Sequence, residues 1–196
     1  MTVGLRQRSG DGSGIWFDIV EKDDAHDLAL CKATAPLKFI ERKGNPGTEQ
    51  PIASLRVSST APTVGDFIAI AGFPLGSWNP AVQLGTVAAT RTTNPNGGRV
   101  PAGQRELLQI SVPGNEGNSG SPVLELDTGE VIGVVVQAQP APLFTPMKQI
   151  PLAQSSGIIL AVPETWVQDL LKRHNVQSIA QPPPKGHTSY YPLPTK

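Results

Sequence analysis

Cysteine is nearly absent from this chain of 196 residues: Cys31 stands alone, so no disulfide can form within the chain. The fold must therefore be stabilised by burial of apolar side chains, and the cysteine usage leaves the redox compartment undecided. Net charge is absent too, because 16 basic and 16 acidic residues cancel. Without an excess of positive charge to attract nucleic acid or an anionic bilayer, we expect neither nucleic acid nor membrane as a partner.

Long apolar runs are also missing. No segment reaches the roughly 18 to 20 apolar residues that cross a bilayer. The N-terminal MTVGLRQRSGDGSG contains no apolar core of a signal peptide. The compartment in which the protein works stays open.

Aromatic residues make up only 5% of the chain, whereas glycine and proline number 20 each. Glycine and proline interrupt the sequence too often for a bundle of long helices, so we expect an all-β fold of short strands. Near-regular spacing of the candidate strands favours a small closed barrel over 66–162, with Asp127-Thr128-Gly129 as a hairpin turn. The six expected strands are 66–73, 81–90, 105–112, 121–127, 130–137 and 156–162.

The remaining segments flank this expected barrel. Residues 1–48 contain a strand, a Gly-Ser-Asp turn, a second strand and the apolar alternation HDLALCKA, and residues 49–65 form a polar connection. PETWVQDLLKRH begins a helix over 163–175, whose apolar stripe of Trp166, Val167, Leu170 and Leu171 should lie against the barrel. Residues 176–196 are rich in proline, and we expect a disordered tail there.

The segment PGNEGNSGSPVL at 113–124 carries the strongest chemical signal. Ser119 lies between glycines in a loop of small residues that leads into a strand. A serine nucleophile needs such a bare loop for substrate access, with backbone N–H groups directed at the developing oxyanion. The plainer alternative is a Gly-Ser hairpin without chemistry. An α/β-hydrolase elbow fits poorly, because G-x-S-x-G requires glycine where Ser121 stands.

GNSGSP resembles the nucleophile motif of trypsin-like serine peptidases, and Ser121 resembles a glutamyl endopeptidase variant of that motif. AGFPLG, QLGTVAATR, GEVIGVVV and GIILAVP follow the order of the high-temperature-requirement branch over roughly residues 14–174. The resemblance implies a chymotrypsin-like double β-barrel whose first barrel is incomplete, with one C-terminal helix. It implies serine endopeptidase activity on a peptide or protein substrate, without cofactor or metal.

The resemblance also implies the other catalytic groups. Asp27 in HDLAL matches the triad aspartate, which would fix the tautomer of an imidazole and stabilise its cation; the alternative is a solvated acid at a strand start. His26 adjoins Asp27 and would point to the opposite face of a strand, so we expect a surface histidine. His174 ends the expected helix and His187 lies in the tail. None matches the family's base.

The missing base suggests that the chain begins late, with the histidine-bearing strands encoded upstream of Met1. As it stands, Ser119 has no general base, so we expect the polypeptide alone to hydrolyse peptides poorly or not at all. A non-catalytic peptide-binding pseudopeptidase is the alternative function. The strings PPPK and PLP in the tail also allow weak contact with SH3- or WW-type domains, although a disordered terminus explains them as well.

By the same resemblance, the backbone N–H groups of Gly117 and Ser119 would form the oxyanion hole. Asn118 stands where activated trypsins have an aspartate that pairs with a new N-terminus, so that ion pair is not available here. The primary pocket carries no charge, which predicts a preference for small or medium apolar side chains, although Val136 fits the barrel core equally well. The residues implied for this pocket are Pro113, Val136, Gln137, Ala138 and Gly157.

Overall fold

The computed structural model describes residues 2–6, 14–34, 38–39, 50–51, 54–76, 80–90, 106–145 and 148–178. The chain forms two compact units. The first comprises residues 1–22, 29–55 and 179–196, and the second comprises residues 23–28 and 56–178. The domain boundaries expected from the sequence stay a prediction, and the proline-rich tail falls outside the described residues from position 179 onward.

Small sheets make up the described part of the first unit. The strands β1 (Thr2–Arg6), β2 (Gly14–Asp23) and β3 (Leu28–Ala33) form a three-stranded sheet in that order. A second sheet pairs β4 (Lys38–Phe39) with β5 (Gln50–Pro51). The two expected N-terminal strands are confirmed, and the Gly-Ser-Asp turn between them lies outside the described residues. That these sheets belong to a first barrel stays a prediction.

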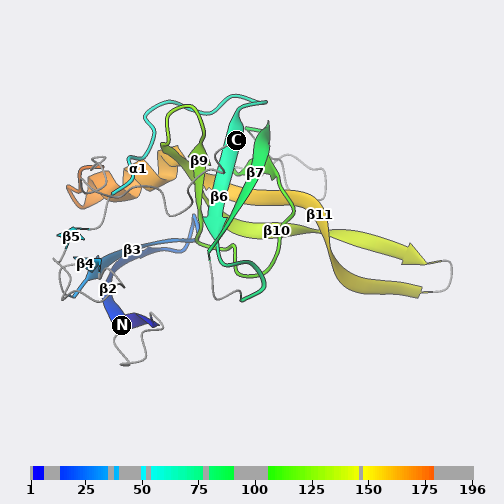
Figure 1. The fold of residues 1–196 in the computed structure, drawn as a ribbon, viewed down its shortest axis with the longest axis horizontal. Coiled ribbons are helices and arrows are strands. Elements are labelled where there is room, and N and C mark those ends of the chain that lie inside the picture. Colours follow the sequence, from blue (N-terminus) through cyan, green and yellow to red (C-terminus); the bar gives the residue numbers. More distant parts are fainter. Residues whose placement is uncertain are drawn as a thin grey trace, which may run out of the picture. The chain divides into compact units, whose positions relative to one another are not determined.

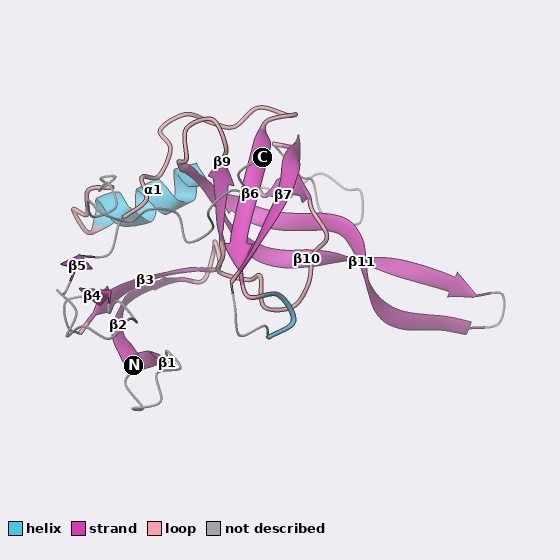
Figure 2. Cartoon of the chain, viewed as in Figure 1, coloured by secondary structure: helices cyan, strands magenta, loops and turns pink. Residues whose placement is uncertain are grey.

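The second unit contains a closed barrel in the strand order β10-β11-β8-β7-β6-β9, which confirms the expected six-stranded barrel (Figures 1 and 2). All of its neighbouring strands run antiparallel, and closure leaves no strand edge unpaired within it. Its strands are β6 (Phe67–Gly72), β7 (Ala81–Ala89), β8 (Leu108–Ser111), β9 (Pro122–Glu125), β10 (Val131–Thr145) and β11 (Lys148–Pro163).

Strands β10 and β11 are much longer than the sequence predicted. Their pairing continues through Pro140↔Ser155 to Thr145↔Lys148, and Figure 1 shows the far half of this hairpin extending beyond the barrel strands. The strands expected from the sequence were 130–137 and 156–162. A two-stranded arm tolerates proline, because an N–H that faces away from the partner strand is not needed for pairing.

Alternation of apolar residues places the core inside the barrel. In β6, Ile68 and Ile70 are fully buried, whereas Phe67 is exposed on the outer face. The two isoleucines lie on the inner face of the strand, and the small Ala69 between them is buried too. The core cluster comprises Ile68, Ile70, Val87, Leu108, Ile110, Val112, Val123, Ile132, Val135, Ile159 and Ala161.

Helix α1 (Glu164–Arg173) follows β11 directly and contacts β10 and β11, which confirms the predicted helix against the barrel. Pro163 is the N-cap in extended conformation, one residue earlier than its expected place inside the helix. Trp166 packs on a second apolar cluster of Leu107, Leu160 and Val162. Among the residues that the structure describes, no helix has the length and apolarity of a membrane span.

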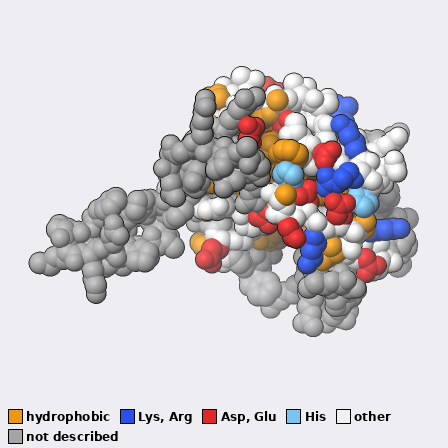
Figure 3. All heavy atoms as spheres, turned by 180° about the vertical axis from the view of Figure 1, so that it is seen from behind, with side chains coloured by type: hydrophobic (Ala, Val, Ile, Leu, Met, Phe, Trp, Pro, Cys, Tyr) orange, Lys and Arg blue, Asp and Glu red, His pale blue; other side chains and the backbone are white. Residues whose placement is uncertain are grey.

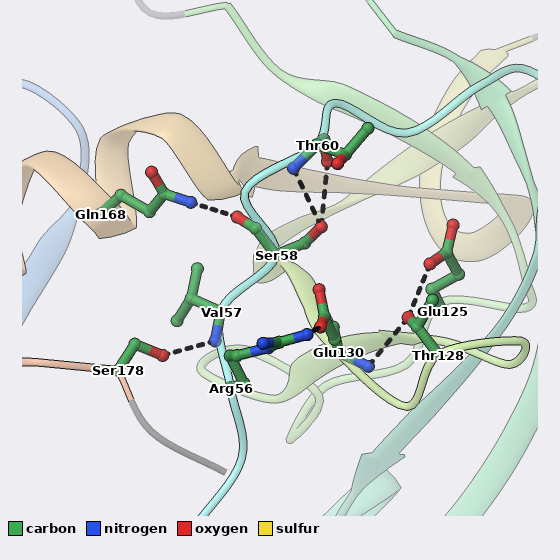
Figure 4. A network of polar contacts seen from close by, with 9 residues as sticks. All are labelled: Arg56, Val57, Ser58, Thr60, Glu125, Thr128, Glu130, Gln168 and Ser178. Carbon is green, nitrogen blue, oxygen red and sulfur yellow. Dashed lines mark hydrogen bonds and ion pairs between the residues drawn. The ribbon is translucent and has the colours of Figure 1, made fainter.

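An extended segment, Arg56–Thr60, links the turn between β9 and β10 to the rest of the unit (Figure 4). The guanidinium of Arg56 binds the carboxylate of Glu130. The Arg56 carbonyl accepts a hydrogen bond from the Val131 N–H at 2.8 Å. Within the turn, the Thr128 hydroxyl donates to Glu125 at 2.6 Å. These bonds fix the start of β10.

The same segment also contacts α1 and the residues that follow it. The side-chain amide of Gln168 on α1 donates to the Ser58 carbonyl, and the Val57 N–H donates to the Ser178 hydroxyl at 2.6 Å (Figure 4). The buried Ser58 hydroxyl is occupied locally by the backbone of Thr60. Residues 56–60 of the expected connection are therefore packed within the second unit.

The carboxyl group of Glu164 is buried in the first turn of α1. Glu164 is 3% exposed, and its Oε2 atom has no hydrogen-bond partner among the described residues. Burial raises the pKa of this carboxyl above 4.5, and a backbone hydrogen bond opposes the shift without cancelling it. Folding thus shifts this carboxyl toward its neutral form relative to the unfolded chain.

Replacing this carboxyl by an amide should stabilise the protein at neutral pH. A raised folded-state pKa means that the stability of the wild type is fully present below the unfolded pKa and falls as pH rises through the folded pKa. At pH 7, Glu164→Gln should therefore raise the free energy of unfolding by about 1 kcal/mol and the Tm by about 2 to 4 °C. At pH 4 the variant and the wild type should differ little. Thermal unfolding at both pH values measures this. The exposed Glu106→Gln is the control, and an equal shift at both pH values would contradict the explanation.

Candidate active site

Ser119 lies on the loop between β8 and β9 and is exposed to solvent. Backbone hydrogen bonds hold this loop against β10 on both sides of Val135. The Gly120 N–H donates to the Val135 carbonyl at 2.7 Å, and the Val135 N–H donates to the Ser121 carbonyl at 2.9 Å. The serine side chain is therefore presented to solvent from a backbone that is anchored to the barrel.

Three further backbone bonds fix the peptide groups around Ser119. The Asn118 N–H donates to Asn115 at 3.3 Å, the Ser121 N–H donates to Asn118 at 3.0 Å, and the Leu75 N–H donates to Glu116 at 2.6 Å. In a trans peptide the N–H points opposite to the C=O. The Gly117 N–H is thus directed away from Leu75, and the Ser119 N–H away from the Ser121 N–H. Neither donates a hydrogen bond to another described residue.

Two glycines near the serine are required by the backbone. Gly117 has a φ of +92°, and a Cβ there would lie 2.2 Å from the Phe73 carbonyl oxygen. Gly72 on β6 lies equally close to the loop, because its Cβ would lie 2.3 Å from Ser121 Oγ. Gly117 therefore packs against the backbone of Phe73, and Gly72 packs against the side chains of Ser121 and Asn118, so a side chain has no room at either position.

Asn118 is buried between the two residues proposed as oxyanion donors. It is 2% exposed, and its Nδ2 atom donates to Gln83 Oε1 at 2.8 Å. Gln83 Nε2 in turn donates to the Pro113 carbonyl at 3.1 Å. The sequence analysis missed Gln83. The available signal was its polar side chain in the inward-facing row of β7, between the exposed Val82 and Leu84.

Residues implied for the substrate pocket lie near this loop. Gly114, next to Pro113, packs so closely that a Cβ there would lie 2.8 Å from Ala138 Cβ and 3.1 Å from Ile159 Cγ1. The β10–β11 register shifts between Val135 and Gln137, which places a bulge at Val136. Bulges are frequent next to active sites because they re-aim side chains.

The individual pocket residues differ in their surroundings. Val136 is half-buried and packs against the cluster of Leu107, Leu160 and Val162, as the core alternative predicted. Gln137 and Ala138 are exposed, and Gly157 has a φ of +78° at the start of the barrel part of β11. Their role in substrate binding stays a prediction.

Asp27 occupies a turn, not a strand. Residues 24–27 connect β2 to β3, and Asp27 itself is exposed with a φ of +58°. The strand alternation argument for His26 and Asp27 was therefore wrong, because neither residue lies on a strand. The pairing of Asp27 with an imidazole beside Ser119 stays a prediction.

His26 is half-buried rather than a surface histidine, because its ring stacks on Trp166 with centroids 3.8 Å apart. Its Nδ1 atom lies 2.9 Å from Asp23 Oδ1, and Arg173 Nη2 donates to Asp23 Oδ2 at 2.8 Å. Burial raises the pKa of Asp23, but the hydrogen bonds from Arg173 and His26 together lower it by more than burial raises it. The pKa of Asp23 therefore lies below its ordinary value of 3.8. These contacts fasten the turn that carries Asp27 to α1.

The remaining histidines are His174 and His187. His174 is the C-cap of α1, as expected, and its N–H donates to the last helical carbonyls. His187 lies outside the described residues. On the face seen in Figure 3, acidic, basic and histidine side chains lie intermixed. Among the described residues, no group of three or more His, Cys, Asp or Glu side chains could hold a metal ion.

The six-stranded antiparallel barrel, its C-terminal helix and the glycine-flanked serine loop define a fold of the chymotrypsin type. An HtrA-type protease, AlgW with a decapeptide, shares the fold with a TM-score of 0.55 and 22% identity over 83% of this chain and 41% of that chain. Rv3671c from M. tuberculosis H37Rv, in the inactive form of a mutant, shares the fold with a TM-score of 0.53 and 20% identity. The match covers 87% of this chain and 70% of that chain.

Sequence comparison identifies the family. Residues 2–134 match the model of the trypsin-like peptidase domain. This match covers more than half of the 196 residues, so the chain belongs to that family.

Individual relatives agree with this assignment. "Probable periplasmic serine endoprotease DegP-like" of Pseudomonas fulva (strain 12-X) is 31% identical over 65% of this chain and 22% of its own length. "Serine protease HTRA1" of Xenopus tropicalis is 28% identical over 90% of this chain and 32% of its own length. The chain spans about a fifth to a third of the lengths of these relatives.

Proposed function

We propose that this chain carries the nucleophile of a serine endopeptidase, with Ser119 as the attacking residue. The observation that carries the proposal is the loop around Ser119. Ser119 is exposed. The Glu116 carbonyl accepts a hydrogen bond from Leu75, and the Asn118 carbonyl accepts one from Ser121, so the peptide groups before Gly117 and before Ser119 are fixed. The N–H groups of Gly117 and Ser119 remain available to an oxyanion. The substrate is a peptide or protein, in keeping with the family.

The other groups follow from this assignment. Asp27 orients the imidazole that takes the proton from Ser119, and the tight fastening of its turn to α1 supports a fixed position for that carboxylate. Pro113, Val136, Gln137, Ala138 and Gly157 line the primary pocket. The absence of charge among them favours small or medium apolar side chains at the cleaved bond.

The chain by itself hydrolyses peptides poorly under this proposal, because none of its histidines matches the family's base. The ring of His26 is engaged by Asp23 and Trp166, and His174 lies at the C-terminal end of α1. Without a base, the Ser119 hydroxyl stays protonated and attacks a carbonyl several orders of magnitude more slowly.

Free imidazole can stand in for the base in a direct test. In the reaction with a fluorophosphonate probe, Ser119 Oγ forms a bond to phosphorus, fluoride leaves, and imidazole takes the hydroxyl proton. We expect labelling of the 196-residue chain to rise at least tenfold with imidazole and to vanish in Ser119→Ala. Asp27→Asn should reduce the imidazole-dependent part by at least tenfold. Equal labelling of Ser119→Ala would contradict the proposal.

A non-catalytic peptide-binding module is the second candidate, favoured by the engagement of the described His26 ring with Asp23 and Trp166. Such a module would bind peptides in the primary pocket without nucleophilic attack by Ser119. Failure of Ser119 to react even with imidazole, together with retained binding of apolar peptides that Ala138→Asp weakens, would support the binding module over the enzyme.

A further inference from the structure

One side chain on β7 binds the loop that carries Ser119 at two points. Gln83 accepts a hydrogen bond from Asn118 Nδ2 at 2.8 Å and donates one to the Pro113 carbonyl at 3.1 Å. Pro113 begins the loop and Asn118 immediately precedes the serine. A single amide therefore connects the implied pocket base to the peptide groups beside the nucleophile.

Asn118 depends on this contact. Its side chain is buried, and its Oδ1 atom has no partner among the described residues. Within the described part of the chain, the bond to Gln83 is thus the hydrogen bond that satisfies the Asn118 amide. A buried amide that loses its bond costs more than a normal hydrogen bond contributes, so the loop has a strong reason to keep this arrangement.

The position of Asn118 gives the contact its consequence. The backbone N–H of Asn118 binds Asn115, and its C=O binds the Ser121 N–H. Rotation of Asn118 would break both turns and reorient the N–H groups of Gly117 and Ser119. Anchoring its side chain to a barrel strand therefore preorganises those donors.

We propose that Gln83 is a positioning residue, which holds the loop 113–120 in its oxyanion-binding conformation through neutral amide hydrogen bonds. This inference rests on the proposed function of Ser119. It assigns to a half-buried side chain of β7 the task of ordering a loop that has no aspartate for an ion pair with a new N-terminus. Because no charge takes part in the Gln83 bonds, the ordering should not vary between pH 5 and 9.

Hydrogen exchange tests the proposal without requiring any reactivity of Ser119. In Gln83→Ala, the amides of Asn118, Gly120 and Ser121 should exchange at least tenfold faster than in the wild type, measured by NMR on the whole chain. Amides of β8 and β11 should change less than twofold. Gln83→Glu keeps the acceptor for Asn118 but loses the donor to Pro113, so it should restore most of the protection.

Matched controls separate a positioning role from a general role in the strand. Val82→Ala alters the neighbouring exposed side chain of β7 and should leave the loop amides unchanged. Unchanged loop exchange in Gln83→Ala, or equally faster exchange throughout the barrel, would overturn the proposal. Imidazole-dependent labelling of Ser119 is measured in parallel. If the wild type is not labelled, the proposal that Ser119 is a peptidase nucleophile fails. If Gln83→Ala is labelled as strongly as the wild type, the proposal that Gln83 positions the loop fails.

Discussion

The Gly117→Ala variant should lose imidazole-dependent labelling of Ser119 by about a hundredfold or more, and it should be less stable by about 2 to 4 kcal/mol. A Cβ at this position would lie 2.2 Å from the Phe73 carbonyl oxygen, which is backbone and cannot rotate aside. The φ of +92° adds strain for any residue with a side chain. The loop must therefore move, and the Gly117 N–H moves with it. Probe labelling and thermal unfolding measure the two effects.

Other glycines of the chain provide controls for this variant. Gly120 and Gly129 also have positive φ values, of +84° and +70°, but no atom lies within 4 Å of a Cβ built on either. Alanine at Gly129 should cost only the backbone strain, about 1 kcal/mol, and should leave labelling unchanged. If Gly117→Ala behaved like Gly129→Ala in both assays, the close approach to Phe73 would be irrelevant to the site.

Replacing Trp166 by alanine should lower the free energy of unfolding by about 2 to 4 kcal/mol, or roughly 5 to 15 °C in Tm. The indole packs on Leu107, Leu160 and Val162 and also stacks on His26. Both contacts disappear in the variant, and a void forms between α1 and the barrel. Because Trp166 is only half-buried, the loss should fall below that of a fully buried tryptophan. Chemical denaturation measures the change.

Two variants divide the role of Trp166 between packing and stacking. Trp166→Phe retains an aromatic face for His26 and should recover more than half of the loss. A double-mutant cycle with His26→Ala should give a coupling of about 0.5 to 1.5 kcal/mol, the range found for aromatic pairs. Val167→Ala on the same helix is the control and should cost about 1 kcal/mol. A Trp166→Ala variant as stable as Val167→Ala would contradict this account of the helix contact.

The barrel could be predicted because its signal is local. Short apolar segments such as 66–73, separated by glycines and prolines at near-regular spacing, identify strands without knowledge of their partners. The helix at Glu164–Arg173 is equally local, since its apolar stripe and terminal charges lie within a few turns. Glycines around Ser119 marked the loop for the same reason.

The errors arose where neighbours in space decide the structure. His26 looked like a surface residue of a strand, but a turn and the distant Trp166 half-bury it. The expected strands were 130–137 and 156–162, but pairing between β10 and β11 continues to Thr145 and Lys148. Nothing in the local sequence reports such contacts.

The sequence by itself determined a six-stranded barrel, a helix that covers part of it and an exposed serine between glycines, because periodicity and backbone freedom are properties of adjacent residues. Only the tertiary structure decided that Gln83 binds Asn118 and Pro113, and that Phe73 leaves no room for a side chain at Gly117. These contacts join residues about 30 or more positions apart. They exist only because barrel closure brings β6 and β7 beside the loop, which no local pattern encodes.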